Sequence, residues 1–145
     1  LTLVTEDTKT DPQAAQEAYA TSTLGNVDCD AALARLTALM IVQGVYKDPD
    51  LSLASLAGRI GISSHQLSEL INTRVGVSYS RYLREKRVAA AKAMLLAEPS
   101  ASVLSVGLSV GFTSQSNFYE AFRELEGMTP GRYRKLQTVA RAAAG

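Results

Sequence analysis

The sequence is poor in the residue types that catalysis, metal binding and disulfide-stabilised secretion usually require. Its 145 residues include no tryptophan, one histidine and one cysteine, Cys29. A lone cysteine cannot form an internal disulfide, and a single histidine beside it does not complete a set of zinc ligands. The composition therefore predicts no metal site and no cofactor, and it favours a reducing cytoplasm.

Long hydrophobic runs are also missing. No stretch approaches the roughly 18 apolar residues that span a bilayer, and no charged-then-apolar leader opens the chain. We therefore expect a soluble chain. Its first residue is Leu rather than Met, which suggests a fragment whose upstream partner is absent. Aromatic residues make up only 6% against 46% hydrophobic residues, so an aliphatic core of small helices is expected.

Charge is divided unevenly along the chain. Residues 1–30 contain one lysine against six acidic residues, a net −5, whereas the remainder has 14 cations and 8 anions, a net +6. A solvated acidic tail explains this simply, but the asymmetry is also typical of a nucleic-acid module behind a linker. We expect residues 1–30 to be an acidic linker, with a short helix at 12–20, or the edge of a missing sensor domain.

An internal repeat organises the rest. Six positions recur fifty residues later: Leu53, Leu56, Ala57, Gly61, Ile62 and Ser63 correspond to Val103, Val106, Gly107, Gly111, Phe112 and Thr113. The apolar spacing of i, i+3 and i+4 indicates a helix with one buried stripe, and the glycines stand where such a helix ends. Each copy therefore predicts a helix, a tight turn and a second helix.

Start signals divide this region into helices. Ser63 and Gln66 have capping-box spacing, and Thr113 or Ser114 can cap the corresponding helix of the second copy. Ser78 precedes a long helix that reaches about residue 97, and Thr129 precedes a proline in the first helical position.

These signals predict an all-α fold with seven helices between residues 31 and 137. The first helix, from residue 31, is expected to end at the Asp-Pro-Asp of residues 48–50. We predict a first helix-turn-helix subdomain at 31–77, a linker helix at 78–97, a second subdomain at 98–137 and a C-terminal tail at 138–145.

The second helix of each copy has a polar face opposite its apolar stripe. The first face contains Ser64, His65, Ser68, Glu69 and Asn72, and the second contains Ser114, Gln115, Ser116, Asn117 and Glu120. Most such faces are merely solvated. The start of the second helix in a helix-turn-helix unit is, however, the part offered to base edges, and these side chains have matching donors and acceptors.

Candidate phosphate contacts flank both units. Cap hydroxyls and helix N-termini attract phosphate, as do cations. The candidates are Arg59, Ser63, Arg74, Ser78, Arg81, Thr113, Ser114, Arg123, Arg132 and Lys135. The 20 residues of the linker helix would extend about 30 Å, and successive major grooves lie about 34 Å apart. The spacing predicts two recognition helices in successive grooves of one double-stranded DNA.

The chain resembles the DNA-binding domain of the AraC/XylS family of bacterial transcription regulators over residues 31–137. The resemblance rests on Arg87, Val88, Ala91, Leu95, Val103, Val106, Gly107, Gly111, Phe112, Phe118, Phe122, Gly127, Thr129 and Pro130. It implies binding beside promoters and contact with RNA polymerase, with no small-molecule site in this region. The family's base-reading positions fall on residues 64, 65, 68, 69, 115, 116, 117 and 120, and its backbone positions include Arg59 and Ser78.

Two features set the chain apart within that family. Glu69 and Glu120 are acidic where several relatives are basic; such residues can accept from cytosine N4 but repel phosphate. The run DPDLSLASLAGRIGISSHQLSELIN at 48–72 also resembles relatives fused to membrane-embedded sensors. That likeness implies a whole protein anchored through an upstream region.

We therefore predict a sequence-specific DNA-binding regulator that is not an enzyme. His65, the only imidazole, has no neighbouring Asp or Cys to form a catalytic relay. The competing interpretation is a helical protein–protein adaptor whose polar faces are ordinary surface. We interpret Arg87 as a salt-bridged structural residue between the subdomains, and Tyr119 as a packing residue.

Overall fold

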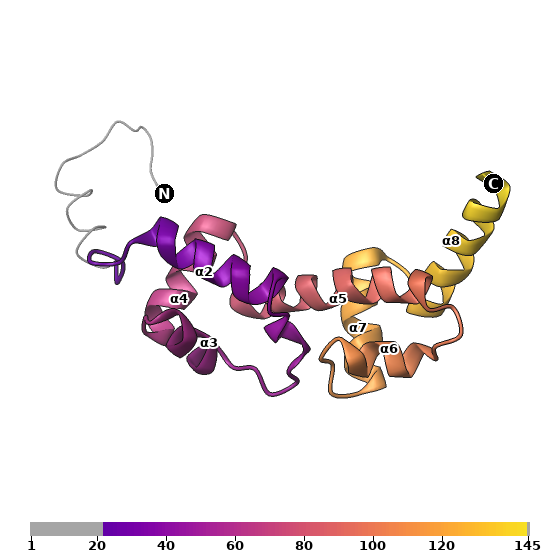
Figure 1. The fold of residues 1–145 in the computed structure, drawn as a ribbon, viewed down its shortest axis with the longest axis horizontal. Helices are drawn as coiled ribbons and strands as arrows, with labels where there is room; N and C mark the ends of the chain where they lie inside the picture. The colour runs from indigo at the N-terminus through magenta and orange to yellow at the C-terminus, as the bar shows by residue number, and fades with distance from the viewer. Residues whose placement is uncertain (1–21, 145) are drawn as a thin grey trace.

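The computed structural model describes residues 22–144 as an elongated arrangement of helices (Figure 1). Seven α-helices occur in this part: α2 (Cys29–Ile41), α3 (Leu53–Ile60), α4 (Ser64–Leu70), α5 (Tyr79–Ala97), α6 (Val103–Ser109), α7 (Gln115–Glu126) and α8 (Pro130–Ala144). A 3-10 turn, η1 (Val45–Lys47), follows α2, and a π-helical turn, η2 (Ile71–Val75), continues α4. The all-α prediction with seven helices is confirmed. The helix expected at 12–20 and most of the expected acidic linker lie outside the described residues.

Two lobes are built on the single helix α5. Helices α2, α3 and α4 form the first lobe, and α6, α7 and α8 form the second (Figure 1). The opening helices of the two repeated units, α3 and α6, both lie below α5 in this view. Helix α5 packs against η1 and η2 at one end and against α6, α7 and α8 at the other. It therefore contributes to both hydrophobic cores.

The two cores differ in composition. The first contains Leu36, Met40, Leu56, Ile60 and Leu67, all at most 2% exposed, and it is aliphatic as expected. The centre of the second core is aromatic, so the expectation of an aliphatic core is wrong for that lobe. There the Phe118 ring lies tilted against Phe112 and edge-to-face against Phe122, at centroid distances of 5.2 and 5.8 Å. All three phenylalanines lie in this second core, whereas Tyr82 is buried in the first.

Local capping signals set the helix starts. The Ser63 hydroxyl accepts from the Gln66 N–H at 3.1 Å, and the Gln66 side chain accepts from the Ser63 N–H at 2.9 Å, which confirms the capping box. In the second unit Ser114 is the cap, because its hydroxyl accepts from the Asn117 N–H at 3.1 Å. Thr113 instead accepts from the side-chain amide of Asn117 at 2.8 Å.

The expected boundaries of the first helix need correction. Helix α2 begins at Cys29, capped by Asp28, and ends at Ile41 rather than at residues 48–50. Gly44 takes a left-handed backbone conformation with φ +64°, which turns the chain into η1. Residues 24, 27 and 29, which belong to the expected linker, pack against the first core.

The C-terminal end of the fold also differs from expectation. Helix α8 continues to Ala144, so the described part of the expected tail, residues 138–144, is helical. Among residues 22–144, no helix combines the length and the apolar character needed to cross a membrane.

Two glycines of the second unit permit close approaches. A Cβ atom at Gly107 would lie 2.4 Å from the Phe118 ring, which confirms that a small residue lets α7 approach α6. Gly111 has φ +112°, and a Cβ atom there would lie 2.3 Å from the Tyr46 carbonyl oxygen. The turn of the second unit therefore fits directly against the first lobe's η1.

Candidate nucleic-acid interface

The polar face of α4 contains most of the residues expected to contact bases in the first unit. His65 and Asn72 are exposed, and Ser64 and Ser68 are partly exposed. Asn72 lies one residue into η2, where its side-chain amide donates to the Ser68 carbonyl at 3.0 Å. Ser63, at the cap, is exposed beside the N-terminus of the helix.

Glu69 is the exception on this face. Its carboxylate accepts from the Ser22 hydroxyl at 2.6 Å and from both the N–H and the hydroxyl of Thr23 at 2.7 Å. The side chain of Gln66 also donates to the Thr23 carbonyl at 3.0 Å. These hydrogen bonds, the one from Ser22 first, lower the pKa of Glu69 below its ordinary value. The residues just before α2 therefore lie against one edge of the polar face.

The corresponding face of α7 is open. Gln115, Ser116, Asn117 and Glu120 are all exposed. Asn117 and Glu120 line an open groove together with Thr113 and with Arg84 of α5. Glu120 makes no hydrogen bond to another residue in the described part of the chain, in contrast to Glu69.

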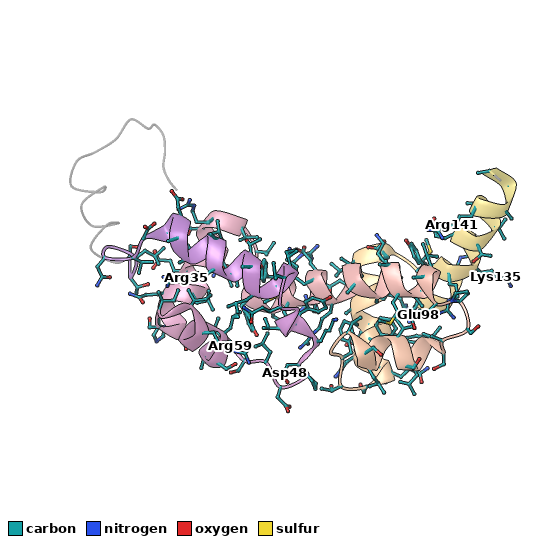
Figure 2. The ribbon with its side chains drawn as sticks, viewed as in Figure 1. Arg35, Asp48, Arg59, Glu98, Lys135 and Arg141 are labelled. Atoms are coloured by element: carbon teal, nitrogen blue, oxygen red, sulfur yellow. The ribbon has the colours of Figure 1, made fainter. Side chains whose placement is uncertain are left out.

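The expected backbone contacts are distributed along the whole molecule. Arg59 lies at the end of α3 in the first lobe and Lys135 on α8 at the far end (Figure 2). Arg59, Arg123, Arg132 and Lys135 are exposed, and none of them forms an ion pair with another residue of the 22–144 region. Arg74 differs, because its guanidinium is paired with the Asp30 carboxylate.

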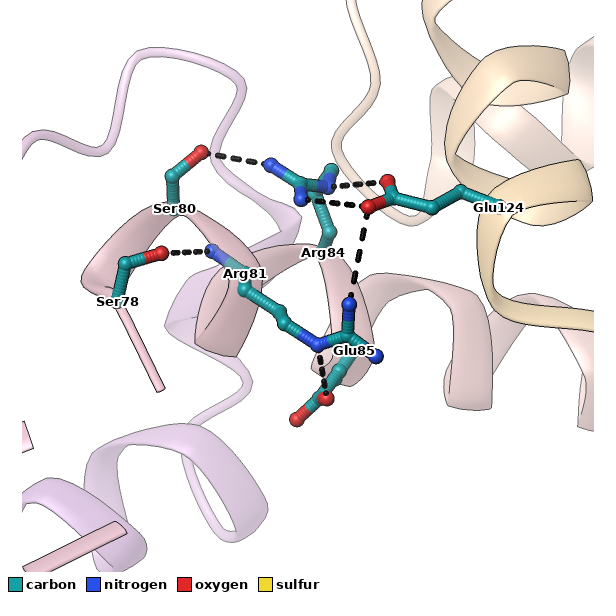
Figure 3. Close-up of polar contacts among 6 residues, drawn as sticks. All are labelled: Ser78, Ser80, Arg81, Arg84, Glu85 and Glu124. Carbon is teal, nitrogen blue, oxygen red and sulfur yellow. Dashed lines mark hydrogen bonds and ion pairs between the residues drawn. The ribbon is translucent and has the colours of Figure 1, made fainter. Parts of the chain in front are cut away.

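Arg81 and Arg84 meet one carboxylate between the lobes (Figure 3). Glu124 of α7 lies 3.7 Å from Arg81 and 3.2 Å from Arg84, and Arg81 also pairs with Glu85 at 3.0 Å. Arg84 additionally donates to the Ser80 hydroxyl at 2.8 Å. The Ser78 hydroxyl caps α5 by accepting from the Arg81 N–H at 3.2 Å. Arg81, an expected phosphate contact, is therefore paired with acidic side chains in this structure.

Arg87 joins the two lobes from the middle of α5. It is buried, and its guanidinium donates to the Tyr46 carbonyl at 2.8 Å and to the Asp48 carbonyl at 2.9 Å. Burial lowers the pKa of this guanidinium. Tyr46 packs against both cores, and Gly111 approaches its carbonyl. The structural interpretation of Arg87 is confirmed, but its partners are backbone carbonyls rather than the expected acidic side chains.

Two of these contacts, those of Glu69 with Ser22 and Thr23 and of Arg87 with Tyr46, could not be predicted from any sequence pattern. Ser22 and Thr23 lie in a stretch without apolar periodicity, 46 to 47 positions from the carboxylate that they contact. Tyr46 lies in a segment where the first helix was expected to continue. Sequence patterns indicate helix caps and helix periodicity among neighbouring residues. They do not indicate contacts between residues about 40 or more positions apart. No three His, Cys, Asp or Glu side chains within residues 22–144 group as metal ligands would.

Comparison with known proteins agrees with this geometry. A family model described as a helix-turn-helix domain matches residues 56–136. The probable transcriptional regulator LumQ of Photobacterium leiognathi is 36% identical over 83 residues, which are 57% of this chain and 33% of that protein. Across the first curated relatives, the matched region spans only 11% to 33% of the relative's length.

Solved structures show the same arrangement of helices. A transcriptional regulator from Chromobacterium violaceum, described as containing an AraC-type DNA-binding domain, matches with a TM-score of 0.63 and 29% identity, over 76% of this chain and 95% of that one. The DNA-binding domain of AdpA, solved in complex with a target DNA, has a TM-score of 0.69 over 77% of this chain and 96% of that one. At 23% identity, the second likeness concerns the fold alone.

Proposed function

Because this chain belongs to the AraC/XylS family of helix-turn-helix transcription regulators, we propose that it binds one DNA duplex by placing α4 and α7 in successive major grooves. The observation that carries the proposal is the attachment of two equivalent units to one continuous helix. Helix α5 has 19 residues, a length of about 28 Å. That length is close to the roughly 34 Å between successive major-groove faces.

The base contacts come from the exposed polar side chains of α4 and α7. In the first unit these are Ser64, His65, Ser68 and Asn72, and in the second they are Gln115, Ser116, Asn117 and Glu120. Amide side chains can pair with adenine, and Glu120 can accept from cytosine N4. Asn117 is already oriented by Thr113, so it loses less rotamer freedom when it binds a base.

The backbone contacts form two groups. Arg59, Arg123, Arg132 and Lys135 need no rearrangement, since they are exposed and unpaired within residues 22–144. Arg74 and Arg81 exchange a carboxylate partner for a phosphate. The cap residues Ser63, Ser78, Thr113 and Ser114 bring helix N-termini to the same strands, where N–H groups favour phosphate.

The wider setting of the chain belongs to the same proposal. The matched region is a minor part of its curated relatives, so we propose that it serves a longer regulator with an upstream sensor domain. We place the DNA-binding part in the bacterial cytoplasm, beside promoters, where it contacts RNA polymerase. Anchoring of the whole protein in the membrane through its upstream region is part of this proposal.

The competing proposal is a protein–protein adaptor without direct DNA readout. It draws on Ile41 and Val42 at the end of α2, whose side chains are 68% and 81% exposed. These two residues offer an apolar contact to another protein. They do not account for the repeated units or for the spacing set by α5.

Selection of bound duplexes from a random library separates the two. We expect two half-motifs whose centres lie about one helical turn, or 10 base pairs, apart. Gln115→Ala and Asn117→Ala should then relax preference in one half-motif by about 1–3 kcal/mol per lost bidentate contact. Arg59→Ala should weaken binding to every sequence and reduce its salt dependence. Failure to enrich any motif would favour the adaptor.

A further inference from the structure

The segment that precedes α2 is attached to the first recognition helix. Glu69 accepts three hydrogen bonds from Ser22 and Thr23, and Gln66 adds a fourth link to the Thr23 carbonyl. Leu24 and Val27 pack against the first core, so the segment is also anchored on the C-terminal side of this contact. The contact is made on α4, the helix that the proposed function places in a major groove, so any role that it has in recognition rests on that function.

The attached segment covers one edge of α4 and leaves the neighbouring edge open. Gln66 and Glu69 are three residues apart and therefore share one stripe of the helix. His65, Ser68 and Asn72, spaced by three and four residues, form the adjacent stripe, and His65 and Asn72 are exposed. The contact with Ser22 and Thr23 is thus made beside the open stripe and not over it.

A carboxylate in this position has two competing uses. It can accept from cytosine N4 in the major groove, or it can accept from protein donors. Two hydroxyls and one backbone N–H already occupy the oxygens of Glu69, at 2.6 to 2.7 Å. Turning the carboxylate away from Ser22 and Thr23 towards a base would break these short charge-assisted hydrogen bonds, which are stronger than neutral ones.

We propose that Ser22 and Thr23 determine the base preference of the first unit by keeping the Glu69 carboxylate away from DNA. The first unit then recognises bases through Ser64 and the open stripe, without Glu69. Glu69 is a positioning residue that holds the upstream segment against α4. Ser22 and Thr23 are specificity determinants, although they lie outside the helix-turn-helix unit.

The second unit provides an internal comparison. Glu120 has the place on α7 that Glu69 has on α4, and no residue from the described part of the chain donates a hydrogen bond to it. The proposal therefore predicts different behaviour of two equivalent acidic residues in one protein. Glu120 should contribute to base preference in its half-motif, whereas Glu69 should not.

The test measures base preference at every operator position for four variants of the full chain. Glu120→Gln should change preference at one position of the second half-motif by about fivefold to tenfold, as expected for loss of a base contact. Glu69→Gln should change no preference. The double substitution S22A/T23A removes both hydroxyl donors and leaves Glu69 only the backbone N–H of residue 23. It should create a cytosine preference in the first half-motif, and adding Glu69→Gln to it should abolish that preference.

Three results would overturn the proposal. Glu69→Gln could alter preference in the otherwise unchanged chain, S22A/T23A could leave every preference intact, or the new preference could survive removal of the carboxylate. Thermal unfolding of each variant identifies any loss of folding, and none is expected because none of the four side chains is fully buried. If the unsubstituted chain shows no sequence preference at all, the proposed function itself is contradicted. That result can be told apart from the three above, which contradict only the role of Ser22 and Thr23.

Discussion

Glutamate side chains near the proposed DNA surface have three different surroundings. Glu69 is held by hydroxyls and a backbone N–H, Glu120 is open to solvent, and Glu124 lies between two arginines. Sequence alone treats the first two as equivalent, because Glu69 directly precedes Leu70 and Ile71 as Glu120 directly precedes Ala121 and Phe122. Their different surroundings arise from contacts with distant parts of the chain.

Glu124 should restrain binding to DNA of any sequence. Its carboxylate competes with phosphate for Arg81 and Arg84, and Arg84 faces the groove shared with Asn117 and Glu120. Glu124→Gln should tighten non-specific binding and steepen the plot of log K against log salt by up to about two units, since each phosphate contact contributes about −0.9. Stability should fall by no more than about 1 kcal/mol, as for exposed ion pairs.

Glu126→Gln is the matched control for this variant. It removes another ion pair between α5 and α7, with Lys92 at 3.0 Å, but Lys92 does not line the groove beside Asn117. Its salt dependence should therefore equal that of the unchanged chain. If both variants simply weaken DNA binding, Glu124 acts only to dock α7 on α5.

The hydrogen bonds between Glu69 and the upstream residues Ser22 and Thr23 should depend on pH. Hydrogen bonds from Ser22 and Thr23 lower the pKa of Glu69 below 4.5. A lowered carboxyl pKa means that the stabilisation is complete above the ordinary value and is lost as pH falls through the lowered one. NMR titration of the Glu69 carboxyl should show this shift, and Ser22→Ala should move the pKa upward. An unchanged titration curve would show that Ser22 does not bond to Glu69 in solution.

At the scale of elements, the two units share one turn geometry but differ in what surrounds it. Gly61 and Gly111 both have positive φ, of +92° and +112°. A Cβ atom at Gly61 would find only the end of the Arg35 side chain, at 3.9 Å, whereas one at Gly111 would collide with backbone at 2.3 Å. The repeat is therefore equivalent in backbone conformation and unequal in packing.

Alanine at these two glycines should separate conformational strain from steric collision. Gly61→Ala should cost about 1–2 kcal/mol, the strain of a non-glycine residue at positive φ. Gly111→Ala should cost at least about 2 kcal/mol more, because it also displaces the Tyr46 carbonyl and its charge-assisted hydrogen bond with Arg87. Denaturant unfolding measures both. Equal losses would mean that η1 moves aside without cost.

Most elements could be predicted from the sequence because their signals are local. Capping by Ser63, Ser78 and Ser114 and the glycine at each turn depend on residues within one helical turn of each other. The end of α2 could not be predicted, because the apolar spacing continues as far as Val45 while the backbone turns at Gly44. The aromatic centre of the second core depends on packing between α6 and α7, which composition does not indicate.

The candidate site was predicted less completely than the fold. The polar residues of α7 are exposed as expected, because a helix with a clear apolar stripe has only one face to bury. The partners of Arg74 and Glu69 are 44 to 47 residues away, and periodicity contains no information about them. Only the Arg81–Glu85 pair has the i,i+4 spacing of one helix face. Which cations are free to meet phosphate is therefore a property of the folded chain.

At the scale of the whole molecule, Arg87 controls how rigidly the lobes are joined. Arg87→Met keeps an unbranched apolar side chain but leaves the Tyr46 and Asp48 carbonyls without their donors. Stability should fall by about 2–4 kcal/mol, since hydrogen bonds to charged groups contribute about 1.5–3 kcal/mol each. Because the two lobes would then be held less rigidly, the loss of affinity for operators with one base pair added between the half-motifs should also be smaller.

Two measurements check that variant. Denaturant unfolding reports the stability, and competition between duplexes of different spacing reports the rigidity. A chain that loses stability but discriminates between spacings as before would show that α5 alone sets the distance between the units. Arg134→Met is a suitable control, since Arg134 also donates to backbone carbonyls, at Leu95 and Glu98, but within the second lobe.

The continuity of α5 has a consequence for how such a protein can change. Each residue of an α-helix advances the chain by about 1.5 Å and turns it by about 100°. Inserting or deleting a single residue between the lobes would therefore swing one DNA-binding unit a quarter-turn or more around the other. Under the proposed function the length of this helix is therefore fixed by the pitch of the double helix, whereas exposed positions outside its ion pairs tolerate substitution.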